Sequence, residues 1–212
     1  AIEHLRLVDN SVEYQTIGGA PPVGLCGSGI LDAMAQLYLA GVVDASGRMV
    51  ADHPRVRNRD GEREFVLVSE EERDGGPAIT ITQHDVRELQ LAKGAIRTGI
   101  QVLLEAKGHS EDDIDQVIIA GAFGTYIDVS SAVTIGMLPP LPLDRFRQVG
   151  NAAGMGAKLA LISRSKRAEA QAIARRVGYI ELATAPRFAQ TFAQANYIGL
   201  YRMAHGKREE IG

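Results

Sequence analysis

Cysteine, tryptophan and long apolar runs are scarce or absent in this sequence of 212 residues. It contains one cysteine, Cys26, and no tryptophan. A single thiol cannot close an internal disulfide or supply the several thiolates of a structural zinc or iron–sulfur site. The apolar runs at 117–122, 135–138 and 159–162 are far shorter than the roughly 18 residues that indicate a membrane span. We therefore expect no metal centre in this chain and no membrane partner.

An excess of basic charge is also missing. The chain has 23 Lys and Arg against 26 Asp and Glu, a formal net charge of −3, and a pI near 6.0. It lacks the excess of positive charge that is typical of proteins that bind nucleic acid or anionic membranes. The 45% hydrophobic and 23% charged residues are typical of a soluble globular protein. We expect a cytoplasmic protein without a nucleic-acid partner.

Motifs of complete hydrolases are missing as well. The sequence has no HExxH, no GxSxG and no evident constellation of paired carboxylates, so we assign no catalytic residue. It starts at Ala1 without a methionine and without the pattern of a signal peptide. We interpret it as a fragment or processed piece of a longer protein.

Strand and helix signals alternate along the chain. A hairpin is expected at 5–8 and 12–17, with Asp9 and Asn10 as its turn. Further strands are expected at 64–68, 78–81, 116–120 and 146–149, and helices at 30–40, 85–106, 152–162 and 164–177. The strand at 116–120 is apolar and is interpreted as buried and parallel. This alternation favours an α/β fold.

Several residues predict where these elements begin and end. Gly41 and Gly108 are expected to end their helices, and Thr82 to cap the longest helix with Asp85 three residues on. The polar segment from about 44 to 77 is interpreted as a surface insertion, with the strand at 64–68 inside it. Gly154 and Gly156 make the helix at 152–162 rich in small residues, which predicts contact with another element.

Three glycine turns are candidate ligand sites, since each lies where a strand of an α/β sheet ends or a helix begins. The first glycine turn, 24–29, precedes a helix whose free amides can face a phosphate. It is neither a Walker A loop nor a GxGxxG pattern, and a structural turn capped by Ser28 is an alternative. The second glycine turn, 121–124, offers bare backbone for an adenine ring or is simply a tight turn. The third is Gly150 with Asn151.

Other residues have a chemical and a structural interpretation. Lys93 lies within the longest predicted helix and is either a ligand-binding or a solvated charge. Cys26 is either a nucleophile activated at a helix N-terminus or a small buried thiol. His84 and Asp85 form a possible catalytic pair by residue type, but a helix cap fits their adjacent positions better.

The first glycine turn, read as GLCGSGILD, resembles the C-terminal domain of the reductive activators of corrinoid proteins. These belong to the actin, sugar-kinase and heat-shock-chaperone ATPase superfamily. The resemblance continues in order through segments that span nearly the whole chain, namely VDASGR, LQLAKGAIRTGI, IIAGAFGTYID, IGMLP, VGNAAGMGA and YIELA.

The resemblance implies a ribonuclease-H-like half-domain that forms one side of a nucleotide cleft, with a surface insertion and extra C-terminal helices at about 164–212. It implies ATP or ADP with Mg²⁺ as ligand. By matching position, 26–29 would be the second phosphate loop, 121–124 the adenosine turn, and Lys93 part of a pocket wall. The implied nucleotide-binding residues are Gly24, Cys26, Gly27, Ser28, Gly29, Lys93, Gly121, Ala122, Phe123, Gly124, Gly150 and Asn151.

In this family ATP hydrolysis drives an electron from an iron–sulfur cluster to a corrinoid cobalt, returning Co(II) to Co(I). The resemblance implies a corrinoid protein of a methyltransferase or demethylase system as partner, and a homodimer. The cysteines of the N-terminal [2Fe-2S] domain and the first ATPase half are absent from this chain, so residues 1–212 are expected to be one C-terminal domain that is inactive alone. Two alternatives remain: a docking or dimerisation module of the same fold, and an activator of another metalloprotein such as an acyl-CoA dehydratase.

Overall fold

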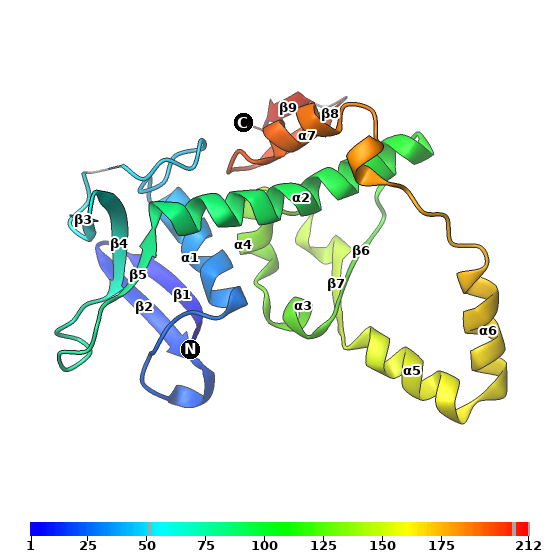
Figure 1. Cartoon of the computed structure of the whole chain (residues 1–212), viewed down its shortest axis with the longest axis horizontal. Coiled ribbons are helices and arrows are strands. Elements are labelled where there is room, and N and C mark those ends of the chain that lie inside the picture. The colour runs from blue at the N-terminus through cyan, green and yellow to red at the C-terminus, as the bar shows by residue number, and fades with distance from the viewer. Residues whose placement is uncertain (51, 205–206, 212) are drawn as a thin grey trace.

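The computed structural model describes residues 1–50, 52–204 and 207–211, and it has a mixed α/β architecture (Figure 1). The strands are β1 (Ile2–Val8), β2 (Ser11–Thr16), β3 (Val56–Arg59), β4 (Glu62–Val68), β5 (Ile79–Thr82), β6 (Val117–Ala120), β7 (Phe146–Gly150), β8 (Tyr201–Ala204) and β9 (Lys207–Glu210). The helices are α1 (Gly27–Leu39), α2 (Gln83–Lys107), α3 (Ala122–Tyr126), α4 (Val129–Thr134), α5 (Ala152–Ile162), α6 (Arg164–Ala174) and α7 (Phe188–Ala195).

The hairpin of β1 and β2 forms as predicted, with Leu7 opposite Val12 and Val8 opposite Ser11. α1 follows the first glycine turn and packs on β1. It begins at Gly27, three residues before the predicted start at Ile30. The apolar residues of α1 join β1, β4, β5 and α4 in one hydrophobic core.

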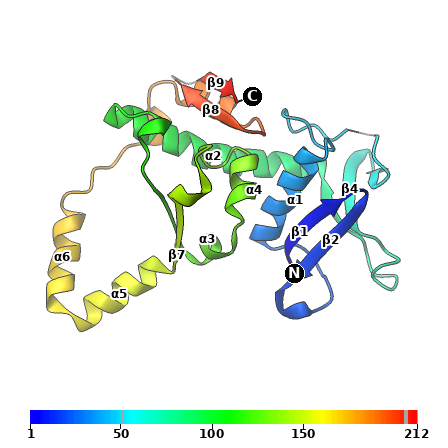
Figure 2. The same ribbon diagram turned by 180° about the vertical axis from the view of Figure 1, so that it is seen from behind.

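α2 is the longest helix and crosses most of the molecule (Figures 1 and 2). Its start is a capping box, in which Thr82 Oγ1 accepts from the Asp85 amide and the Asp85 carboxylate accepts from the Thr82 amide. Its end is Gly108 in the left-handed conformation. Both predicted boundaries are confirmed, and the cap interpretation of Asp85 is confirmed with them.

The segment interpreted as a surface insertion also contributes to the core. β4 is the central strand of an antiparallel sheet with the order β3-β4-β5. Phe65, Leu67 and Val68 are almost fully buried in the main hydrophobic cluster. The prediction of an exposed excursion is therefore wrong for β4, because a run of apolar residues inside a polar segment still folds onto the core.

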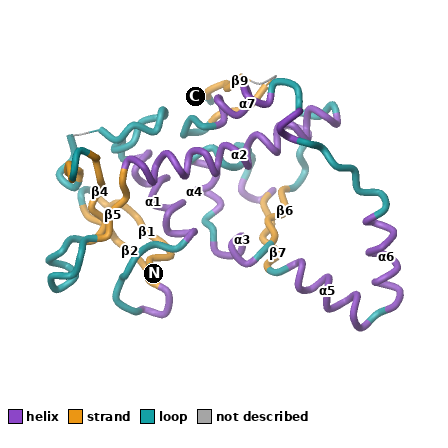
Figure 3. Tube along the Cα trace, in the orientation of Figure 1, coloured by secondary structure: helices purple, strands orange, loops and turns teal. Residues whose placement is uncertain are grey.

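β6 and β7 pair in parallel, as predicted for the strand at 116–120. Partly buried and exposed residues alternate along β6, and Ile118 is 60% exposed, so the expectation of a buried strand is wrong. Figure 3 shows the strands in separate small groups.

α5 and α6 extend away from the rest of the chain as a helical arm (Figures 1 and 2). Within the described ranges neither helix has a buried residue, and they pack on each other. We expected the small-residue helix α5 to contact another element. In the structure it contacts α6, at the end where the two helices join. None of the described helices is long and apolar enough to span a membrane.

The C-terminal segment is not wholly helical, in contrast to the prediction. After α7 it forms the hairpin of β8 and β9, with Tyr201 opposite Glu210. α7 and this hairpin lie along α2 on the side opposite α4 (Figure 1). Gly94 permits the close approach of α2, because a Cβ at that position would overlap the side chain of Asn196.

Candidate nucleotide site

The structure brings the three glycine turns together. A Cβ on Gly27 would overlap the ring of Phe123, which places the second glycine turn over the N-terminus of α1. The Gly121 amide donates to the Gly150 carbonyl at 2.7 Å, so the second and third turns adjoin at the ends of β6 and β7. Eleven of the twelve sequence-predicted residues, from three distant segments, therefore belong to turns that adjoin one another.

Glycine is required in the first glycine turn for steric reasons. A Cβ on Gly29 would overlap the carbonyl of Ile2, so α1 can lie this close to β1 only without a side chain there. The turn is joined to β1 by two backbone hydrogen bonds, from the Ile2 amide to the Gly24 carbonyl at 2.8 Å and from the Cys26 amide to the Ile2 carbonyl at 3.0 Å. The backbones of β1 and of the first turn of α1 therefore approach each other closely.

Cys26, not Ser28, occupies the N-cap position of α1, and the structure shows no side-chain cap bond there within the described part of the chain. Ser28 lies inside the first turn and donates from Oγ to the Glu3 carbonyl at 2.9 Å. The interpretation of Ser28 as the cap is therefore wrong, because the helix begins at Gly27 and its N-cap lies two residues before Ser28.

The start of α1 favours negative charge. Burial raises the pKa of the Cys26 thiol, but the Ser28 hydroxyl, 3.1 Å from Sγ, and the neighbouring Gly29 and Ser28 amides outweigh it, so the pKa lies below its ordinary value. Amides at a helix N-terminus stabilise a thiolate by the same electrostatics that would favour a phosphate oxygen.

The second and third turns have defined backbone shapes. Gly121 has φ 102° and precedes α3, which begins at Ala122. Gly124 packs so closely on Ile119 that a Cβ would lie 2.6 Å from its Cγ2. Gly150 has φ 64°, and Asn151 caps α5 by accepting from the Gly154 amide at 2.8 Å. Phe123 is 51% exposed and offers an open ring face beside Gly27.

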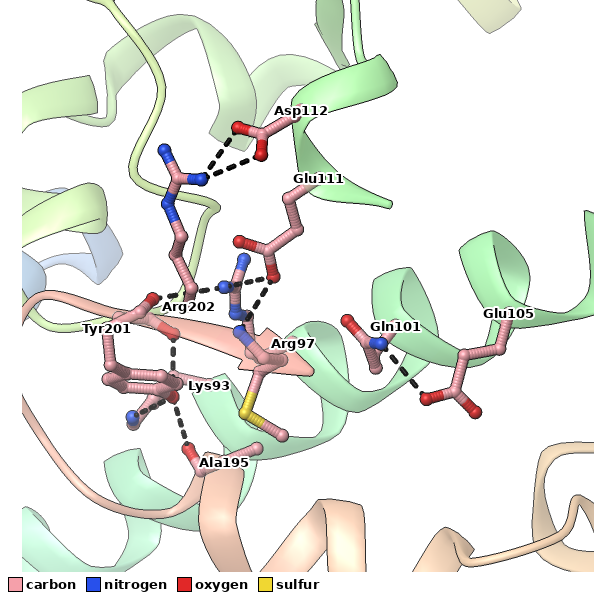
Figure 4. Close-up of polar contacts among 11 residues, drawn as sticks. Lys93, Arg97, Gln101, Glu105, Glu111, Asp112, Ala195, Tyr201 and Arg202 are labelled. Carbon is pink, nitrogen blue, oxygen red and sulfur yellow. Dashed lines mark hydrogen bonds and ion pairs between the residues drawn. The ribbon is translucent and has the colours of Figure 1, made fainter. Parts of the chain in front are cut away.

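Lys93 lies elsewhere, on the face of α2 that meets the C-terminal segment (Figure 4). Its side chain is almost fully buried, and Nζ donates to the Tyr197 carbonyl and to Tyr201 Oη, the latter at 3.2 Å. Burial, with Arg97 and Arg208 nearby, lowers the pKa of Lys93 to about 7. Its contacts among the described residues join it to the C-terminal segment and not to the glycine turns. It is not a solvated charge either.

Sequence reasoning missed a polar pair beside the first glycine turn. His4 Nδ1 lies 2.9 Å from Asp32 Oδ2, and the Asp32 side chain is 7% exposed. Both residues line a cavity of about 530 Å³ between the β1–β2 hairpin, α1 and α4. They are 28 residues apart, and no local pattern connects a strand histidine to a helix aspartate.

Comparisons with known proteins identify the family of this chain. Residues 1–207 match the family model described as the C-terminal domain of RACo, the ASKHA domain. The chain belongs to this family. It is an ASKHA-type domain of mixed α/β structure.

Relatives of this ASKHA domain are corrinoid activators. The chain is 41% identical over 209 residues to the corrinoid activation enzyme RamQ of Eubacterium limosum, covering 94% of this chain and 35% of RamQ. It is 26% identical over 172 residues to the [Co(II) methylated amine-specific corrinoid protein] reductase of Methanosarcina barkeri, covering 80% of this chain and 28% of the reductase.

A solved structure of a reductive activator for a corrinoid, iron–sulfur protein superposes with a TM-score of 0.85 at 40% identity, covering 93% of this chain and 32% of that protein. The chain thus spans about a third of the length of the relatives that it matches.

Proposed function

We propose that this chain is the ATP-binding ASKHA part of a reductive activator. In the whole protein, ATP hydrolysis would drive the reduction of Co(II) to Co(I) in a corrinoid protein of a methyltransferase system. The convergence of the three glycine turns at the N-terminus of α1 carries this proposal. The names of relatives that are 41% and 26% identical to it over the aligned residues support the corrinoid protein as the acceptor.

The residues around α1 fit a nucleotide. Glycine at positions 27 and 29 lets Phe123 and β1 pack directly on the first turn of α1, and the amides at this helix N-terminus suit a phosphate. In this proposal residues 26–29 hold phosphate oxygens, and Phe123 with the bare backbone of Gly121 and Ala122 contacts the adenosine. The bound Mg²⁺ would neutralise phosphate charge. The other side of the cleft would come from further chain, which is why we propose that this part alone does not hydrolyse ATP.

The iron–sulfur cluster of such an activator has no place among these residues. A [2Fe-2S] cluster takes four protein ligands, usually thiolates, whereas the chain has Cys26 alone. We therefore assign the cluster to a different part of the whole protein. The part of the chain described by the structure has no group of three or more His, Cys, Asp and Glu that could hold a metal ion.

A thermal-shift titration tests nucleotide binding. Mg-ADP and Mg-ATP are added to the 212-residue chain and to its Gly27→Val and Gly156→Val variants. A ligand that binds only the folded state stabilises it by about 2.7 kcal/mol at a hundredfold excess over Kd. We expect a saturable shift for the wild type, and none for Gly27→Val, because the added side chain overlaps the Phe123 ring and displaces the second glycine turn from the first.

Gly156→Val is the matched control, since a Cβ at Gly156 in α5 meets nothing within 4 Å. It should retain the shift. Equal shifts in all three proteins would place the nucleotide elsewhere. No shift in any of them up to millimolar nucleotide would contradict binding by this chain alone.

A second candidate function is a docking or dimerisation module, favoured by the exposed helical arm. Several apolar side chains of the arm and its flanks are open to solvent, namely Met155, Leu159, Leu161, Ile162, Ile173 and Val177. A helix that is apolar around most of its circumference usually packs against a partner. We propose a homodimer or a docked partner on this arm. Activation of a different acceptor, such as an acyl-CoA dehydratase, is distinguished by which protein the whole activator reduces.

A further inference from the structure

Successive residues of β1 hold the first turn of α1 in place. The Ile2 carbonyl accepts from the Cys26 amide at 3.0 Å, and the Glu3 carbonyl accepts from Ser28 Oγ at 2.9 Å. The strand therefore determines where the amides of the first glycine turn lie.

His4 makes the next contact of this series through its side chain. Asp32 follows Ser28 by one turn of α1, and its Oδ2 lies 2.9 Å from His4 Nδ1. The Asp32 side chain is 7% exposed, and its Oδ1 is buried with no hydrogen bond within the described residues. His4 is thus the side chain that pairs this carboxylate.

Other charged groups line the same cavity without replacing His4. Arg6 and Glu13 come from the hairpin and Asp128 from the start of α4. Asp128 accepts from the Ser131 amide as the cap of α4, so it adds negative charge near Asp32. Loss of His4 would leave a buried carboxylate unpaired, a state that costs more than a neutral hydrogen bond.

We propose that His4 is a positioning residue for nucleotide binding. Its Nδ1–H bond to Asp32 holds the second turn of α1 against β1 and thereby orients the amides of residues 27–29 toward a phosphate. This role rests on the nucleotide site proposed above. It does not require His4 to touch the nucleotide.

The test compares His4→Ala, His4→Asn and the control Gln15→Ala in the 212-residue chain. The amide nitrogen of asparagine is as many bonds from the backbone as imidazole Nδ1, so His4→Asn can keep the bond to Asp32. Gln15 lies opposite His4 in the hairpin and bonds to Glu3 Oε1, not to α1.

Two quantities are measured: hydrogen exchange of the Ile30 amide, which donates to the Cys26 carbonyl at 3.0 Å, and the affinity for Mg-ADP. We expect His4→Ala to raise the exchange rate and weaken the affinity, each about tenfold. His4→Asn and Gln15→Ala should stay close to the wild type. If His4→Ala does not fold, His4→Gln replaces it in the comparison. The amide nitrogen of glutamine lies one bond further from the backbone than imidazole Nδ1, so it does not reproduce the bond to Asp32.

Two outcomes overturn the proposal: unchanged values in His4→Ala, or equal losses in His4→Ala and His4→Asn. A wild-type chain that binds no Mg-ADP contradicts the proposed function in this chain. The exchange rates of the Ile30 amide then test the positioning role by themselves. A rate that is raised in His4→Ala but close to the wild type in His4→Asn supports this role.

Discussion

At the residue scale, the buried Lys93 is the most unusual charge in the chain. Arg97 and Arg208 lie nearby, Arg97 pairs with Glu111 at 2.5 Å, and the Tyr201 hydroxyl accepts from the Lys93 ammonium. The ordinary lysine pKa of 10.5 is lowered to about 7. Between these values the unfolded chain binds one proton more than the folded chain, so the free energy of unfolding rises with pH.

We expect Lys93→Met to remove this pH dependence. In the wild type, each pH unit above about 7 adds up to ~1.4 kcal/mol to the free energy of unfolding, until the unfolded lysine also loses its proton. Below pH 7 Lys93 is protonated in both the folded and the unfolded chain, so it adds no increase in the free energy of unfolding with pH. Urea unfolding of both proteins at pH 7, 8 and 9 measures the difference. If the free energy of unfolding changes with pH in the same way in both proteins, Lys93 is charged in the folded state.

At the element scale, α2 depends on its capping box. Thr82 Oγ1 and the Asp85 carboxylate satisfy each other's amides at the start of this helix of 25 residues. We expect Thr82→Ala to lower the free energy of unfolding by about 1 kcal/mol, measured by urea unfolding. Ser130→Ala is a control, because Ser130 is exposed on α4 and its substitution should change stability by less than about 0.5 kcal/mol.

If Thr82→Ala lowers the free energy of unfolding no more than this control does, the tertiary packing of α2 on α7 and β5 stabilises the helix without the cap. The capping box was visible in the sequence because it is local: threonine and aspartate three residues apart at the end of a strand. The packing partner α7 was not, since it lies about 100 residues further along the chain.

At the scale of the whole molecule, the helical arm predicts self-association. Leu161 and Ile162 are 76% and 74% exposed at the tip of α5. We expect the double variant Leu161→Glu with Ile162→Glu to lower the average mass in sedimentation equilibrium, because like charges on both copies oppose contact. Its free energy of unfolding should stay within about 0.5 kcal/mol of the wild type.

A variant with Arg175→Glu, at an exposed position after α6, controls for added charge outside the apolar surface. If the wild type is monomeric at all concentrations, a homodimer through this arm is excluded. If it associates and the double variant associates equally, the contact lies on another surface.

The sequence by itself determined those features that depend on neighbouring residues. The Thr82 and Asp85 cap, the Gly108 end, the β1–β2 turn and the glycine turns all follow from local backbone chemistry. The resemblance of its ordered motifs to corrinoid activators is confirmed by the family match over residues 1–207. The role of each glycine-turn residue in nucleotide binding stays a prediction.

Only the tertiary structure decided which distant segments meet. It placed Phe123 over Gly27, joined His4 to Asp32, buried Lys93 beneath the C-terminal hairpin and drew β4 into the core. It also left α5 without a buried residue, although α5 packs on α6. These outcomes depend on burial and on side-chain pairs far apart in the chain, and the free energy of such contacts is a property of the folded whole.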